Sequence, residues 1–253
     1  MSGANNIDEV VVALDHIIAA ALAERSRIGL FAALYRQVTL RIRQGIADGM
    51  FDDGPRMDRL DTVFANRYLD ALAAWQAGRR PSKCWRLAFD ATQRADLLIL
   101  QHLLLGINAH INLDLGVASA QVAPGAALPG LRADFERINQ ILAALTAAVE
   151  VVLERFSPLV HLIDGVGDEL DDSIINFSLT AAREDAWLHA QLLAALPPAF
   201  QDATIAVIDA KTRFLGRVVA EPGPVVTRLL NIVRLPESDD IPAIITALNS
   251  IVV

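Results

Sequence analysis

The sequence has a single cysteine, Cys84, among 253 residues, and aromatic residues make up only 6% of it. One cysteine cannot form an internal disulfide, which excludes the disulfide-stapled secreted domains and fits a reducing compartment. Basic residues are scattered and the net charge is -8, so neither a nucleic acid nor an anionic membrane surface is an expected partner. These features predict a cytoplasmic protein.

Long uncharged apolar runs are missing as well. The most apolar stretches, residues 10–23 and 97–107, are each interrupted by polar or charged side chains. Roughly 18 or more apolar residues are needed to cross a bilayer, so no transmembrane segment is predicted. Residues 1–10 include Asp8 and Glu9 and no basic side chain, which argues against a secretory signal.

The short motifs that identify common enzyme classes are absent too. The chain has no G-x-S-x-G nucleophile elbow, no glycine-rich phosphate loop, no H-E-x-x-H and no C-x-x-C. Their absence makes the common enzyme classes less expected.

Apolar residues make up 53% of the chain and recur at three- and four-residue spacing, without the two-residue alternation of half-buried strands. This pattern predicts an all-α fold in one domain, 1–253: a bundle of about eight to ten helices around a central apolar helix at about 94–117. Helices are expected near 7–23, 27–47, 56–76, 82–92, 94–117, 131–155, 173–195, 198–219 and 241–251, with a short helix before the last, a loop at 118–130 and an irregular connection at 158–172. In the 131–155 helix, Asp134 is expected on the solvent side.

The central helix carries an unusual polar stripe. His102, Gly106, His110 and Asp114 follow one another at four-residue steps, each turned by ~40° about the axis. His102 and His110 would be ~12 Å apart, too far to bind one ion together. His110 and Asp114 are one turn apart, so they can bind the same metal, or the carboxylate can fix the histidine tautomer. Gly106 is expected to leave an open space in which a pocket begins.

A second pair with the same spacing, Asp185 and His189, lies on a later helix. If the two helices face each other, His110, Asp114, Asp185 and His189 would hold a divalent zinc, iron or manganese ion inside the bundle. The alternative is purely structural, because a core histidine is usually hydrogen-bonded and an Asp and His pair at this spacing is usually a helix-surface contact.

Two further polar groups have the same two interpretations. Asn108 and Asn112 form another four-residue pair, and amides in so apolar a segment need partners if they are buried. Asp61, Arg67 and Tyr68 crowd the third helix, where Arg67 would form either a buried ion pair with a carboxylate or a clamp on an anionic or carbonyl group of a ligand.

Two segments carry a resemblance to a known family. Residues 64–72, F-A-N-R-Y-L-D-A-L, and 101–115, Q-H-L-L-L-G-I-N-A-H-I-N-L-D-L, resemble a bacterial family catalogued as domain of unknown function 5995. The likeness extends from about the second predicted helix to the seventh, and it implies no activity.

A more remote likeness concerns the spacing G-x-x-x-H-x-x-x-D at Gly106, His110 and Asp114. It is similar to a helical motif of the zinc-dependent phospholipase C and P1 nuclease group, which is all-helical and holds several zinc ions through His and Asp. This chain departs from that motif because residues 115–117 are L-G-V in place of P-x-H, and because it has only five histidines. The departure puts a three-zinc site in doubt and leaves a one- or two-metal site open.

Three functions remain open from the sequence. The first is a metal-dependent hydrolase, in which a metal-bound water attacks the substrate, His102 serves as acid or base and Arg67 neutralises an anionic group. The second is a noncatalytic module that binds a small hydrophobic ligand, oriented by the Asn and His side chains. The third is a structural or assembly protein that forms a homo-oligomer through the apolar residues 241–253.

Overall fold

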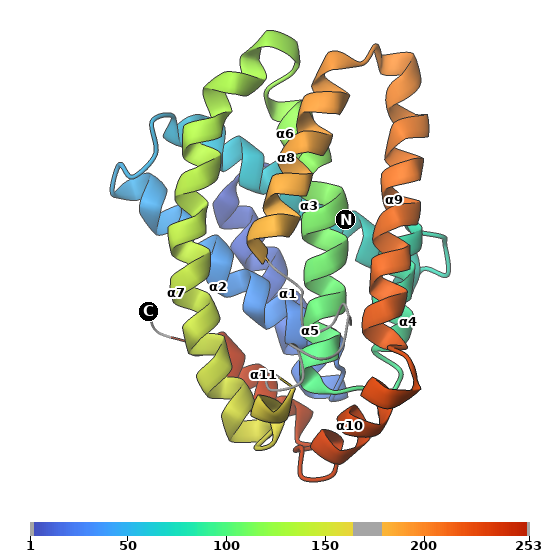
Figure 1. Cartoon of the computed structure of the whole chain (residues 1–253). Coiled ribbons are helices and arrows are strands. Elements are labelled where there is room, and N and C mark those ends of the chain that lie inside the picture. Colours follow the sequence, from blue (N-terminus) through green and yellow to red (C-terminus); the bar gives the residue numbers. More distant parts are fainter. Residues whose placement is uncertain (1–2, 164–178, 252–253) are drawn as a thin grey trace.

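The computed structural model describes residues 3–163 and 179–251, and all regular secondary structure in these two ranges is helical (Figure 1). If the two α-helical parts of the central helix are counted as one, the described residues form ten α-helices. The predicted all-α class is therefore confirmed. Of the predicted 173–195 helix, residues 173–178 lie outside the described ranges, as does most of the 158–172 connection.

The N-terminal part contributes four helices. α1 (Ile7–Glu24) begins where the Asn6 side chain accepts a hydrogen bond from the Glu9 amide, a normal N-cap. α2 (Ile28–Ala47) folds back against α1, and α3 (Gly54–Gln76) and α4 (Lys83–Ala91) follow. Their bounds lie within two residues of those predicted from the apolar spacing.

The central helix runs through the middle of the bundle as one rod from Ile99 to Val122. It consists of α5 (Ile99–Ala109), a π-helical segment (His110–Leu115) and α6 (Gly116–Val122). It begins five residues later and ends five residues later than predicted. Its start is set where the Gln101 side chain accepts a hydrogen bond from the Leu98 amide, and it continues through residues that the sequence assigned to a loop.

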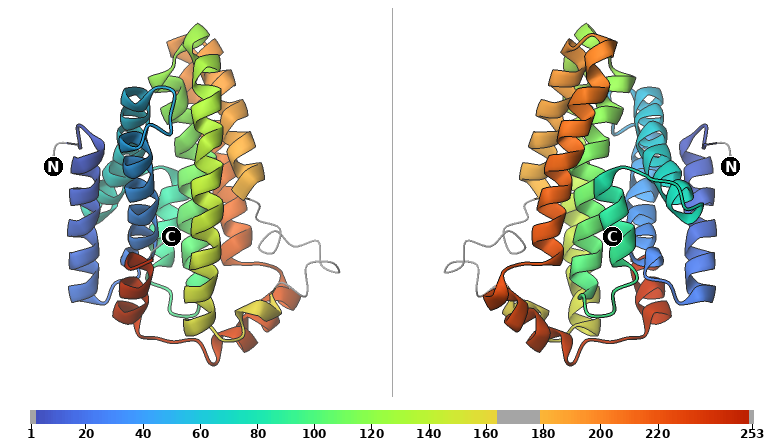
Figure 2. Two further views of the ribbon diagram at one scale, coloured as in Figure 1. Left: turned by 90° about the vertical axis from the view of Figure 1, so that its left-hand side faces the viewer. Right: turned by 90° about the vertical axis from the view of Figure 1, so that its right-hand side faces the viewer.

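Other helices cover the central rod on every side. α2 and α3 pack against it from one flank and α8 and α9 from the opposite flank (Figure 2), while α4 packs against both the rod and α9. By length and composition this rod could cross a bilayer, but 94% of its apolar window lies buried inside the bundle. The core helix of a bundle meets the same criterion, and the absence of a membrane span stays a prediction.

The C-terminal part completes the bundle. It contains a 3-10 turn (Gly125–Leu131), α7 (Arg132–Phe156), a second 3-10 turn (Val160–Leu162), α8 (Leu179–Ala195), α9 (Pro198–Ala220), α10 (Pro224–Arg234) and α11 (Ile241–Asn249). Proline lies in the first turn of α9, α10 and α11, where its missing N–H leaves no hydrogen bond unmade.

The last helix does not present the apolar surface that was expected to mediate assembly. α11 packs against α1, α2 and α7 at the base of the bundle, and Ile244, Ile245 and Leu248 are completely buried. The Gln37 side chain also donates a hydrogen bond to the Asn249 carbonyl at 2.6 Å. The apolar face of residues 241–251 is therefore part of the protein's own core, and residues 252–253 of the proposed assembly surface lie outside the described range.

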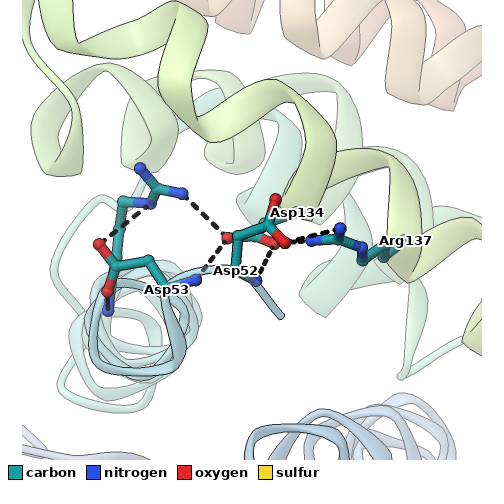
Figure 3. Close-up of polar contacts among 5 residues, drawn as sticks. Asp52, Asp53, Asp134 and Arg137 are labelled. Atoms are coloured by element: carbon teal, nitrogen blue, oxygen red, sulfur yellow. Dashed lines mark hydrogen bonds and ion pairs between the residues drawn. The ribbon is translucent and has the colours of Figure 1, made fainter. Parts of the chain in front are cut away.

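The expectation that Asp134 lies on the solvent side of α7 is also wrong, because its side chain is fully buried. Its carboxylate accepts hydrogen bonds from the backbone amides of Asp52 and Asp53 at 2.7 and 3.1 Å, and it pairs with Arg56 and Arg137 (Figure 3). The carboxylate thus joins the start of α7 to the turn that precedes α3.

Candidate functional site

The site is organised around the carboxylate of Asp114, which lies in the π-helical segment and is almost completely buried. Arg67 Nε on α3 donates to Oδ1 at 2.7 Å, and Trp85 Nε1 on α4 donates to Oδ2 at 2.7 Å. His110 Nδ1, one turn earlier in the same segment, lies 3.4 Å from Oδ2. Three helical elements therefore meet at one carboxylate, and the Arg67 ion pair is the structural alternative that the sequence left open.

This arrangement fixes the protonation of His110. A carboxylate can only accept hydrogen bonds, so the imidazole presents Nδ1–H to Asp114 and keeps the lone pair on Nε2. Burial lowers the pKa of His110, more than the charge of Asp114 raises it, so the ring is neutral at neutral pH. Among the described residues, none forms a hydrogen bond with Nε2.

Aromatic rings surround His110. Phe64 stacks on the imidazole with ring centroids 3.5 Å apart, and Tyr35 meets it edge-on at 4.5 Å. Phe31 lies slightly farther away and packs against Gly106, where an added β-carbon would come within 2.5 Å of the Phe31 ring. The open space expected at Gly106 is therefore filled, because a side chain from α2 occupies it.

The cavity lies elsewhere, between α2, α3, the central helix and α7. We call this space, of about 250 Å³, the His110 cavity. Nearly all the side chains around it are apolar. They include Leu34, Val38, Leu100, Leu103, Leu104, Ile107, Ile111, Leu142, Leu145, Val149, Leu153 and Leu179. Its polar side chains are Thr146 and Glu150, which are exposed, and His110 and Tyr35, which are buried.

A smaller space of about 40 Å³ adjoins the His110 cavity and shares Val38 and Phe64 with it. Asp61 is among the residues that line this smaller space, and its carboxyl oxygens are buried without a hydrogen-bond partner among the described residues. Burial, followed by the charge of Asp58, raises the pKa of Asp61 to about 7. A buried carboxyl group without a partner is unusual in a folded protein, and such groups cluster at functional sites.

A third hollow, of about 350 Å³, lies between α1 and the second half of α3. Its lining includes His16, Glu24 and Asp70, and none of its side chains contains a buried polar atom without a partner. We therefore consider the His110 cavity the better candidate site.

Comparison with known families shows which family the chain belongs to. The model of the family described as "Family of unknown function (DUF5995)" matches residues 7–222. The chain belongs to the DUF5995 family. No curated protein and no solved structure matches it significantly, and the more remote likeness to the zinc-dependent phospholipase C and P1 nuclease group finds no support among these comparisons.

The two segments by which the chain resembles DUF5995 proteins meet at the site. Residues 64–72 contribute Phe64 and Arg67, and residues 101–115 contribute His110 and Asp114. The description of the DUF5995 family names no activity, so function is argued below from the geometry alone.

The four residues predicted to bind a metal do not converge in this DUF5995 chain. α8 does pack against the π-helical segment and α6, as the metal hypothesis required. However, Asp185 forms an ion pair with Lys211 at 2.7 Å, with both side chains partly exposed. Within residues 3–163 and 179–251, no three His, Cys, Asp or Glu side chains are grouped as a metal site requires. Metal binding stays a prediction from the sequence.

His189 and His102 lie apart from the His110 cavity. The β-carbon of His189 faces Gly116 at the contact between α8 and α6. His102 lines a separate space of about 20 Å³ next to Gly106. Burial lowers the pKa of His102 to about 3, so it is a neutral core side chain at neutral pH. The space beside His102 is too small for a substrate, so the structure offers no support for its predicted role as acid or base.

Asn108 and Asn112 form the structural network that the sequence offered as one alternative. Asn112 donates to the Asn108 side chain at 3.0 Å, and Asn108 donates to the Thr212 carbonyl on α9 at 2.9 Å. These bonds attach the central helix to α9. Tyr68 belongs to the aromatic cluster, and its hydroxyl, whose pKa burial raises, has no partner among the described residues.

Sequence reasoning missed the partners that come from distant parts of the chain. Phe64, Tyr35 and Trp85 surround or anchor the His110 and Asp114 pair, yet nothing in their spacing marks them as more than core residues. The sequence predicted a pocket at Gly106, and the hydrophobic surroundings of His110, which most of the central helix shares, gave no better position for it.

Proposed function

We propose that this protein binds a small hydrophobic ligand in the His110 cavity. The observation that carries the proposal is an apolar space lined by His110 and Tyr35, whose buried Nε2 and hydroxyl have no hydrogen-bond partner in the described part of the chain. Ligand sites have this composition: mostly hydrophobic walls and a few placed polar groups that orient the ligand.

The size of the cavity sets the size of the ligand. An engineered cavity of about 150 Å³ in another protein accepts benzene, and drug-sized ligands occupy roughly 300–1,000 Å³. A space of about 250 Å³ lies between these limits. The expected ligand therefore has one or two rings, or an equivalent short chain.

The competing hypothesis is the metal-dependent hydrolase. It needs a free carboxylate beside His110, but Asp114 already accepts from Arg67 and Trp85. Among the described residues that line the cavity, none is a serine or cysteine that His110 could activate as a nucleophile. The geometry therefore favours binding over hydrolysis.

The test is a titration with the fluorescent probe N-phenyl-1-naphthylamine, whose emission rises in apolar surroundings. We expect saturable binding with one probe per chain. Ile107→Trp adds bulk to the cavity wall and is expected to weaken binding at least tenfold. Val207→Trp adds a comparable bulk on the exposed face of α9 and is expected to leave binding unchanged.

The proposal is wrong if the wild-type protein does not bind the probe, or if Ile107→Trp binds it as well as the wild type. Elemental analysis of the purified protein addresses the competing hypothesis. Stoichiometric zinc, iron or manganese that is lost in His110→Ala would support a metal site and the hydrolase.

A further inference from the structure

We infer that the ligand of the His110 cavity is a neutral alcohol or phenol, which donates its hydroxyl hydrogen to Nε2 of His110. This inference rests on the proposed function and adds the polarity of the ligand to it. It depends on the direction of the hydrogen bonds around His110, on the absence of cations in the cavity lining, and on the charges nearby.

The direction of the hydrogen bonds is set outside the cavity. Arg67 and Trp85 both donate to Asp114, which leaves the carboxylate as an acceptor for the third contact, from His110 Nδ1. The other tautomer would place the Nδ1 lone pair against a carboxylate oxygen, which is repulsive. Nε2 is therefore an acceptor, and a ligand atom that meets it must be a donor.

The His110 ring is held in this orientation by its neighbours. The face of Phe64 stacks on it with the two planes 8° from parallel, and Tyr35 packs against it in a T-shaped arrangement. A half-turn of the ring about the Cβ–Cγ bond would put Cδ2 in the place of Nδ1 and break the contact with Asp114. The acceptor is therefore positioned before any ligand arrives, which reduces the entropy lost on binding.

Charge excludes an acidic ligand. Within residues 3–163 and 179–251, no lysine or arginine lines the His110 cavity, whereas Glu150 lies on its exposed side. Arg183 lines only the adjoining small space, and its guanidinium already donates to Asn139 and to the Phe135 carbonyl. A carboxylate in the His110 cavity would be desolvated without a counter-ion, and it would offer an acceptor to another acceptor.

A ligand hydroxyl is also a suitable hydrogen-bond partner for the hydroxyl of Tyr35. Its side chain lines the same cavity beside His110, and its hydroxyl forms no hydrogen bond of normal geometry with a described residue. Thr39 is a polar neighbour of that hydroxyl. A ligand hydroxyl can accept one hydrogen bond while it donates another, which an amine cation or an ether cannot do.

The experiment compares three compounds that share one ring system: 2-naphthol, its methyl ether 2-methoxynaphthalene, and 2-naphthoic acid. Each is titrated into the wild-type protein at neutral pH, by calorimetry or by displacement of the fluorescent probe. A hydrogen bond to a buried acceptor contributes about 1–3 kcal/mol when its loss leaves the acceptor unpaired. We expect 2-naphthol to bind between about 5- and 150-fold more tightly than the ether, and the acid to bind most weakly.

A variant of similar shape assigns the effect to His110. His110→Phe removes the acceptor and keeps an aromatic ring next to Phe64, so naphthol and the ether are expected to bind it equally. Nitrogen-15 NMR of histidine-labelled wild-type protein gives a second readout that does not depend on the variant folding. The Nε2 resonance of His110 is expected to shift with naphthol and not with the ether.

The outcomes separate the two proposals. If none of the three compounds binds, the proposed function fails. If all three bind with equal affinity, or if the acid binds best, the cavity is a ligand site but the inferred polarity is wrong. If His110→Phe keeps the preference for naphthol, the donor contact is made elsewhere and the inference is overturned.

Discussion

The backbones of Gly116 and Ala186 lie so close that a β-carbon added to Gly116 would come 2.7 Å from the Ala186 carbonyl oxygen. Gly116 begins α6 and Ala186 lies in the middle of α8. The contact lets these two helices approach backbone to backbone, next to the π-helical segment that carries His110 and Asp114.

Gly116→Ala is therefore expected to destabilise the protein by about 1–3 kcal/mol, because the neighbouring atom is backbone and cannot move aside. The better helix propensity of alanine, worth about 1 kcal/mol, offsets part of a larger steric penalty. Chemical denaturation measures the change. Gly130→Ala is the control: its nearest neighbour would be the end of the Arg56 side chain at 3.6 Å, and a change within about 0.5 kcal/mol is expected. Equal effects at both positions would contradict the interpretation.

Arg67→Met tests the structural role of the Arg67 ion pair. The change leaves the buried Asp114 carboxylate without its cation, so we expect a loss of about 2–4 kcal/mol in the free energy of unfolding. In the double variant that combines Arg67→Met with Asp114→Asn, the loss in the free energy of unfolding should be smaller than the sum of the two single losses by at least about 1 kcal/mol. Arg94→Met, which removes an exposed pair with Asp96, should cost less than about 1 kcal/mol. Additive losses at Arg67 and Asp114 would show that the two side chains are not coupled.

Asp61 predicts a pH dependence of stability. Its pKa is about 7 in the folded protein and near 3.8 when exposed, so the folded state holds this proton more tightly than the unfolded state does. The free energy of unfolding is therefore expected to fall by roughly 1.4 kcal/mol for each pH unit between about 4 and 7, and to stay level above that range. Asp61→Asn should remove this slope, so it stabilises the protein relative to wild type at pH 8 more than at pH 5. Melting temperatures at the two pH values measure this, with Asp202→Asn on the exposed face of α9 as the control. A wild-type slope that survives in Asp61→Asn would assign it to another group.

Asp134 predicts the opposite pH behaviour. Burial raises the pKa of Asp134, but hydrogen bonds from the Asp52 amide, from Arg56 and from the Asp53 amide together outweigh burial and hold the pKa below its ordinary value. Its contribution to stability is thus present above about pH 4 and is lost as the pH falls below that value. Asp134→Asn is expected to cost about 2–4 kcal/mol at pH 7, because two arginines lose their common anion and an NH2 donor replaces one of the two oxygens that accept from them and from the amides. Acid titration monitored by circular dichroism measures both effects. The exposed Asp8→Asn should leave the acid transition unchanged.

The sequence predicts most helix bounds because an amphipathic helix leaves a three- and four-residue repeat, and nearly every helix of this bundle buries one face. It also predicts the contact of His110 with Asp114 and the ion pair of Arg67 with a carboxylate, because both depend on local spacing or on the need to pair a buried charge. The predicted single domain and cytoplasmic location stay predictions.

Other features depend on contacts between distant segments, which one sequence does not contain. The Phe31 ring that fills the space at Gly106 comes from α2, and the amides that draw Asp134 inward come from the turn before α3. The burial of α11 depends on the grooves of α1, α2 and α7. None of these contacts changes the local apolar pattern, so the spacing alone placed Asp134 at the surface and left the final helix without a partner.

The π-helical segment of the central helix also has a geometric consequence. A π turn contains more residues than an α turn, so the residues after it are rotated about the axis relative to a continuous α-helix. The first half of the rod directs Leu103, Leu104 and Ile107 toward the cavity, and the second half places Gly116 against α8. With a deletion of one residue between His110 and Leu115, every later side chain would point about 100° away from its present neighbour. The chain length of this one segment therefore sets the angle between the half of the central helix that lines the cavity and the half that packs against α8.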